Sequence, residues 1–124
     1  MHGCLGQILS LYAESLVVVG LLEDWGMLEI EVYEVRGFCP VYKVGDKMVI
    51  DGPNLLLDRT DAVCIHALST LLHYVVALDH GVDPMVLGLT KPEDREHAYI
   101  QCVDPGRPYT NGGTVIFRVR RISR

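Results

Sequence analysis

The sequence predicts an α+β domain in which one main helix, over about residues 61–79, packs on a small, largely antiparallel sheet or curved partial barrel of about four strands. Several short segments alternate apolar and polar residues and are separated by turn-forming Gly, Pro, Asn and Asp. One longer segment repeats its apolar residues at helical spacing. The length of 124 residues favours one domain that buries a core without disulfides or metal.

Residues 1–26 are predicted to be an N-terminal extension, and residues 27–124 the single domain. The stretch 5–22 is almost wholly apolar, but three consecutive valines and Gly20 weaken a helix there. The extension is therefore expected to be a separate helix or disordered. A second interpretation is that it is not part of the natural protein. The codons for the Leu-Glu-Asp that precedes Met27 can contain a purine-rich ribosome-binding sequence, which would make Met27 the natural start.

The first strand of the domain is predicted to begin at Met27, with apolar residues at alternate positions and Glu34 continuing the same face. Gly37 ends it. A Gly-Asp turn then leads to a second strand over about residues 47–50. The segment "DGPN" breaks the chain again. The third and fourth strands are expected in "HAYIQCV" and "TVIFRVRRI", on either side of the turn-rich loop "DPGRPYTNGG".

The main helix is predicted between these strand pairs. Its N-cap is expected at Asp58, Thr60 or Asp61, and Gly81 closes it. The apolar residues that recur at helical spacing are Cys64, Leu68, Leu71, Val75 and Leu78. Three histidines, at positions 66, 73 and 80, are spaced seven residues apart along the helix. This spacing separates them by about 10.5 Å, which is too far for two of them to bind one metal ion, so they are expected to face solvent in part.

Charge and composition exclude some classes of function. A net charge of −5 argues against broad binding of nucleic acid, which needs a basic surface. Four arginines near the C-terminus form either a solvated strand face or a local anion or RNA contact: Arg118, Arg120, Arg121 and Arg124. No secretion signal precedes the domain, and the apolar run near the N-terminus is too short to span a bilayer. A cytoplasmic protein with reduced thiols is expected.

Three cysteines, Cys39, Cys64 and Cys102, are each expected at the end of a strand or helix, whereas Cys4 lies in the extension. Two interpretations are open. The three cysteines form a shared metal or thiol site, or each of them packs as a small apolar residue. No C-x-x-C spacing supports a zinc ribbon. No residue completes a fourth ligand position well, because His66 is expected to point away from Cys64 on a helix. An iron–sulfur cluster is therefore favoured, and zinc is less expected.

The loop after the third strand is a second candidate site. Asp104, Gly106 and Arg107 lie in "DPGRPYTNGG", where backbone amides and the guanidinium could hold an anion. The other interpretation is an ordinary hairpin loop. No Walker loop, dinucleotide fingerprint, G-x-S-x-G or H-E-x-x-H motif is present in the sequence.

The segments "VRGFCPVYKVGDKMVIDG", "DAVCIHAL", "AYIQCVDPG" and "YTNGGTVIFRVRRI" resemble a family of small, uncharacterised archaeal and bacterial conserved hypothetical proteins with three separated cysteines. The resemblance covers about residues 28–122 and places the family cysteines on Cys39, Cys64 and Cys102. The chain departs from the bacterial form at Gln101, where that form has a further cysteine, and at His66, where it has a tryptophan-rich segment. The resemblance implies that the three thiols belong together, but it implies no reaction.

The sequence leaves the class of function open. The first hypothesis is a module that holds an iron–sulfur cluster, either as an enzyme or as an electron carrier. The alternative is a non-catalytic module that binds protein or RNA and whose cysteines are structural. A thiol enzyme with Cys64 as nucleophile, beside His66 or His97 as base, is the least favoured, because the sequence places no base. A homodimer is an open alternative for the assembly.

Overall fold

The computed structural model describes residues 26–124, so almost all of the predicted extension, and Cys4 with it, lies outside the described residues. The predicted α+β class is confirmed. The sheet is antiparallel and open, and it has five strands in the order β3-β2-β1-β5-β4 rather than about four or a partial barrel. The strands are β1 (Met27–Gly37), β2 (Lys47–Asp51), β3 (Asn54–Leu55), β4 (Ala98–Gln101) and β5 (Gly113–Ile122).

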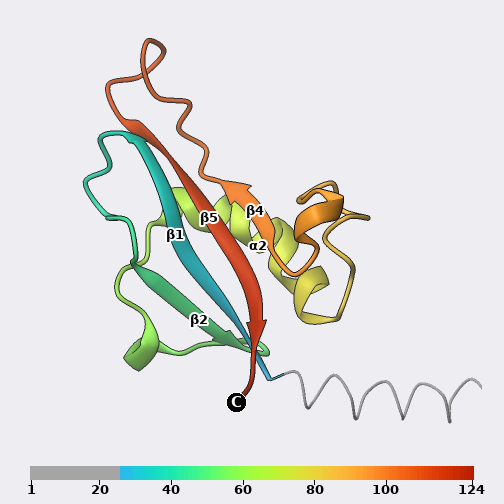
Figure 1. The fold of residues 1–124 in the computed structure, drawn as a ribbon. Helices are drawn as coiled ribbons and strands as arrows, with labels where there is room; N and C mark the ends of the chain where they lie inside the picture. The colour runs from blue at the N-terminus through green and yellow to red at the C-terminus, as the bar shows by residue number, and fades with distance from the viewer. Residues whose placement is uncertain (1–25) are drawn as a thin grey trace, which may run out of the picture.

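The helix α2 (Ile65–Asp79) lies across one face of the sheet, behind β1 and β5 in the view of Figure 1. Two short 3-10 helices, Leu57–Arg59 and Pro92–Asp94, lie in the connections before α2 and before β4. The two-residue strand β3 was not predicted, because it begins at the last residue of "DGPN" and is too short to show alternation. No helix among residues 26–124 is long and apolar enough to cross a membrane.

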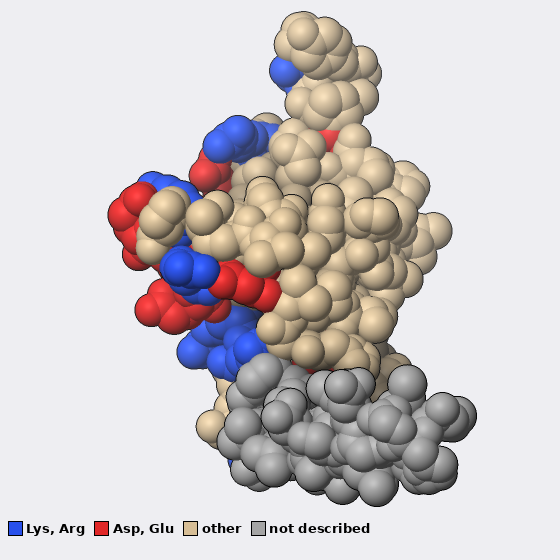
Figure 2. All heavy atoms as spheres, turned by 90° about the vertical axis from the view of Figure 1, so that its right-hand side faces the viewer, with Lys and Arg blue, Asp and Glu red and all other residues tan. Residues whose placement is uncertain are grey.

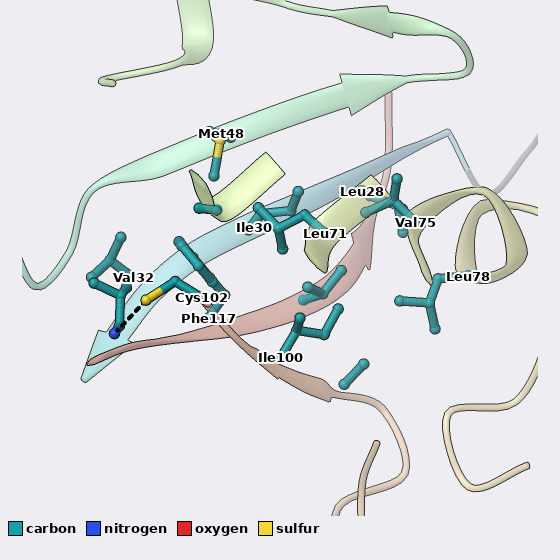
Figure 3. Packing of buried hydrophobic residues seen from close by; sticks show 14 of the residues in the cluster. Leu28, Ile30, Val32, Met48, Leu71, Val75, Leu78, Ile100, Cys102 and Phe117 are labelled. Atoms are coloured by element: carbon teal, nitrogen blue, oxygen red, sulfur yellow. Dashed lines mark hydrogen bonds between the residues drawn. The ribbon is translucent and has the colours of Figure 1, made fainter. Parts of the chain in front are cut away.

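The core lies between α2 and the inward face of the sheet (Figure 3). Alternate residues of β1, β4 and β5 point toward α2, as period two requires. Phe117 is completely buried at the centre, and the ring of Tyr42 meets it edge to face, with 5.4 Å between ring centroids. The helix contributes the buried stripe Ala67, Leu71, Val75 and Leu78.

The alternation of β1 does not continue to Glu34 as predicted. The register of β1 against β5 shifts between Val32 and Glu34, so one extra residue is inserted there. Such a bulge reverses the faces of the residues that follow it. Val35 therefore packs against the core, and Glu34 pairs with Arg36 on the outside.

The predicted start of the helix is wrong by four residues. Thr60 and Asp61 do not cap α2: the Asp61 carboxylate accepts the amide of Lys47, and the Thr60 hydroxyl donates to the carbonyl of Leu56. The N-cap is Cys64, with extended backbone angles, and no side chain caps the helix there. The predicted end is confirmed, because Gly81 follows the helix with a φ of +91° that favours glycine.

The other face of the sheet carries a ladder of opposite charges. Arg118 and Arg120 of β5 stand directly opposite Glu31 and Glu29 of β1, at 2.9 and 3.0 Å between nitrogen and oxygen. Opposite charges at paired positions stabilise an antiparallel sheet. Figure 2 shows that most Lys, Arg, Asp and Glu side chains in that view gather on its left-hand side and that a broad surface without charged residues lies beside them.

Candidate functional site

The loops after β1 and before β5 leave the same end of the sheet, because Gly37 and Gly113 pair with each other (Figure 1). The N-terminus of α2 adjoins these loops at a cavity of about 630 Å³. The walls are mainly apolar, with a few polar groups, as in most small-molecule and cofactor sites. The residues that line it and carry sulfur, charge or a hydroxyl group are Cys39, Tyr42, Cys64, His66, Cys102 and Asp104.

Cys39 lies in the loop after β1 and is partly buried. Pro40 follows it and restricts its backbone to extended conformations. The chain then turns, so that the backbone amide of Tyr42 donates to the Cys39 sulfur at 3.3 Å. This hydrogen bond holds the sulfur in place at the turn.

Cys64 is the N-cap of α2 and not a residue of its first turn, where the helical spacing had predicted it. This changes the geometry of the pair Cys64 and His66. Two residues of one helix two positions apart point in different directions, but the extended backbone of Cys64 allows both side chains to line the same cavity. His66 therefore lines the cavity that Cys64 lines. The expectation that the two side chains point away from each other stays a prediction.

Cys102 follows directly after β4 and is buried, with 7% of its surface exposed. Its sulfur accepts the backbone amide of Val115 at 3.2 Å (Figure 3) and lies 3.9 Å from the carbonyl oxygen of Gly113. The amide of Cys102 donates to the carbonyl of Val115, so β5 fixes the position of this residue.

Tyr42 connects two of the three cysteines, a role that the sequence did not predict. Its amide donates to the Cys39 sulfur, and its hydroxyl accepts the amide of Cys64 at 2.9 Å. The same hydroxyl lies 3.5 Å from the sulfur of Met48. Burial raises the pKa of Tyr42. The only signal in the sequence was a tyrosine shortly after a Cys-Pro turn, which does not reveal a contact with a residue 22 positions away.

The three cysteines line one cavity, but their sulfurs do not all come within 4.8 Å of one another. Ligands of a single zinc ion lie closer, because each Zn–S bond is about 2.3 Å long. Among the described residues 26–124, one group has possible ligand atoms that all lie within 4.8 Å of one another. Its members are Asp94, Glu96 and His97. Asp94 already pairs with His97 and accepts the hydroxyl of Tyr99, and Glu96 is exposed.

The predicted anion loop is organised by its own carboxylate. Asp104 accepts the amide of Gly106 at 2.8 Å and the hydroxyl of Thr110. A Cβ at Gly112 would meet a carboxylate oxygen of Asp104, so a larger residue there would displace that side chain. Arg107 is exposed and does not line the cavity. Anion binding by Asp104, Gly106 and Arg107 stays a prediction.

The Asp104 contacts predict a pH effect. Hydrogen bonds from Thr110 and from the Gly106 amide hold the pKa of Asp104 below its ordinary value. A carboxylate whose pKa is lower in the folded chain than in the unfolded chain stabilises the fold at pH values above its unfolded pKa, which is about 4. This contribution to stability is lost as the pH falls from about 4 toward the lower pKa of the folded chain. We expect Asp104→Asn to unfold with less dependence on pH in this acidic range than the parent chain, measured by urea unfolding from pH 6 to about 2.

The matched control for this experiment is Asp58→Asn, at an exposed position of the first 3-10 helix. It removes one exposed carboxylate without touching the loop that Asp104 organises. An Asp104→Asn variant whose acid sensitivity equals that of the control would contradict the assignment of Asp104 as the residue that holds the loop.

No protein-family model matches the chain, and neither a curated protein nor a solved structure is significantly similar to it. The resemblance to three-cysteine archaeal and bacterial proteins therefore stays a prediction. The basis for assigning a function is the chemistry of the cavity and of the cysteines that line it.

Proposed function

We propose that the protein holds an iron–sulfur cluster in this cavity, with Cys39, Cys64 and Cys102 as ligands. The observation that carries the proposal is the convergence of three separate segments. The loop after β1, the N-terminus of α2 and the end of β4 each contribute one cysteine to the lining of the same cavity. Cys102 also belongs to the core and Cys39 and Cys64 pack against it, so a site is assigned here because of the cavity that all three line.

The backbone around the sulfurs supports ligands that carry negative charge. Amides of Tyr42 and Val115 donate to the sulfurs of Cys39 and Cys102. Cys64 stands at the N-terminus of α2, where the helix dipole favours negative charge. Hydrogen bonds to sulfur are also among the features that set the reduction potential of a cluster.

The spacing of the sulfurs favours a cluster over one zinc ion. The sulfurs do not gather as closely as ligands of a single ion do. A four-iron cluster places each thiolate on a different iron and so accepts more widely separated cysteines. Three protein ligands on a four-iron cluster leave one iron for another group, and His66 and Asp104 line the same cavity. Catalysis and electron transfer are both open to such a centre.

A non-catalytic protein-binding module is the second candidate function. Two exposed apolar residues at the cavity favour it: Phe38 is 67% exposed and Ile65 is 76% exposed. With this function the cysteines are structural. RNA binding has less support, because Arg118 and Arg120 already pair with glutamates of β1.

The experiment is anaerobic reconstitution of the full chain with iron and sulfide, read by visible absorption. We expect the parent chain to gain the absorption of thiolate–iron charge transfer. Cys39→Ala and Cys64→Ala are expected to lose most of it, and both positions are only partly buried, so both variants should fold. Cys102→Ala is expected to lose it as well, but its buried position also costs stability.

Cys4→Ala provides the control, because this cysteine lies outside the predicted domain. It should retain the full absorption. Circular dichroism on each variant separates loss of the cluster from loss of the fold. A parent chain that gains no absorption, or variants that all keep it, would leave the protein-binding module as the surviving function.

A further inference from the structure

The cysteine cavity has the size and the lining of a site for a small organic molecule. Its volume of about 630 Å³ lies within the range of about 300–1,000 Å³ that is usual for such sites. Apolar side chains form most of its wall, and four of them are exposed to solvent: Phe38, Val41, Val63 and Ile65. A ligand with an apolar body would remove these side chains from water, which favours binding.

The charge of the cavity wall is acidic. Asp104 is the only Asp or Glu among the described residues that line the cavity, and no Lys or Arg of residues 26–124 lines it. The other lining residues that can change their charge are the three cysteines, Tyr42 and His66, and neutral His66 can accept a hydrogen bond. An anionic ligand would therefore meet a carboxylate and no permanent positive charge, so the wall selects against anions.

One oxygen of the Asp104 carboxylate is left for a ligand. Oδ1 accepts both the amide of Gly106 and the hydroxyl of Thr110. Oδ2 lies against Gly112, where no Cβ stands in its way, and it accepts no hydrogen bond from residues 26–124. A carboxylate oxygen at an apolar wall forms strong, charge-assisted hydrogen bonds with the N–H groups of a cation.

We propose that the cavity binds a small organic cation, with an ammonium group at Asp104 and an apolar body against Phe38 and Ile65. Phe38 and Tyr42 are the aromatic residues of the lining, and the face of an aromatic ring attracts an ammonium group. The carboxylate and the rings thus suit the charged end of such a ligand, and the apolar wall suits its body.

The assignment of a cation rests in part on the proposed function. A cluster with three thiolate ligands adds negative charge to the cavity and strengthens the preference for a cation. A small amine is then the class of substrate that such a centre would meet. Asp104 requires the same preference by itself, so the preference should also appear in the chain without a cluster.

The test is isothermal titration calorimetry of the full chain, without a cluster, at neutral pH. The three probes carry a phenyl ring on the same short chain and differ in the charge of the end group: phenethylamine, phenethyl alcohol and phenylpropanoate. We expect phenethylamine, which is a cation at neutral pH, to bind at least about tenfold more tightly than phenethyl alcohol. Phenylpropanoate should bind most weakly of the three.

Two substitutions change the charge of the wall in different ways. Asp104→Asn retains an oxygen that can accept the hydrogen bonds from Gly106 and Thr110, and it should reduce the preference for the amine over the alcohol to less than about threefold. Ile65→Lys adds a cation at an exposed position of the wall, so it should weaken binding of phenethylamine at least about fivefold and favour phenylpropanoate. Val44→Lys is the matched control, because Val44 is exposed in the loop between β1 and β2 and does not line the cavity. It should leave the three Kd values unchanged.

Circular dichroism shows which variants fold. A cluster-free parent chain that does not prefer phenethylamine overturns the inference, and so does a preference that a folded Asp104→Asn or Ile65→Lys chain retains in full. The same titration after anaerobic reconstitution separates this inference from the proposed function. A chain that gains no cluster but prefers the amine loses only the proposed function, whereas a chain that gains the cluster but shows no preference in either form loses only this inference.

Discussion

Replacing Phe117 with alanine is expected to lower the free energy of unfolding by about 3–5 kcal/mol. Phe117 has no exposed surface and lies on β5, an inner strand of the sheet, between Val32 of β1 and Ile100 of β4. Its ring also meets the ring of Tyr42. The substitution removes the largest fully buried side chain of the core and leaves a cavity that the rigid sheet cannot close. Urea unfolding followed by circular dichroism measures the change.

Tyr109→Ala is the matched control, because Tyr109 is an aromatic residue that is 80% exposed. Its substitution should change the unfolding free energy by less than about 0.5 kcal/mol. A loss at Phe117 as small as the loss at Tyr109 would show that the core is not centred where the structure places it. Because Tyr42 contacts two cysteines, we also expect Phe117→Ala to disturb the cavity.

The second large effect is expected at Gly113, where β5 begins beside the cavity. A Cβ at this position would lie 2.5 Å from the carbonyl oxygen of Arg36 and 2.6 Å from the amide nitrogen of Phe38. Both are backbone atoms, so β1 and the loop that carries Cys39 must move away. We expect Gly113→Ala to cost more than about 2 kcal/mol of stability and to weaken any metal binding that needs Cys39.

Gly45→Ala separates this clash from the general cost of replacing a glycine. Gly45 has a φ of +96°, but a Cβ there would meet no atom within 4 Å. Its substitution should cost roughly 1–2 kcal/mol and leave the cysteine cavity intact. Thermal and urea unfolding of both variants give the comparison. If Gly113→Ala costs no more than Gly45→Ala, the close approach of β5 to the loop after β1 is wrong.

The sequence was most informative where the pattern of side chains is local. The alternation in "MLEIEVYEV" and "TVIFRVRRI" located the two long strands, because each has one face on the core and one outside. Gly81 marked the end of α2 because the backbone there needs a positive φ. The bulge before Glu34 could not be predicted, since an extra residue in one strand depends on its pairing with the other.

The candidate site depended on contacts that a local pattern does not record. The positions of Cys39, Cys64 and Cys102 at element ends predicted a loop-lined site, and the structure places all three on one cavity. The sequence did not reveal the role of Tyr42 or the place of His66. Tyr42 acts through contacts distant in the chain, and His66 shares the cavity because α2 begins one residue after Cys64.

The central claim is that the three cysteines hold an iron–sulfur cluster, and the most direct measurement is the metal content of the full chain purified without oxygen. Iron, acid-labile sulfide and zinc are measured in one sample, without reconstitution. We predict several iron atoms for each chain and a matching amount of sulfide, both lost in Cys39→Ala. Protein with neither iron nor sulfide, or with a single zinc ion that survives Cys39→Ala, would contradict the claim.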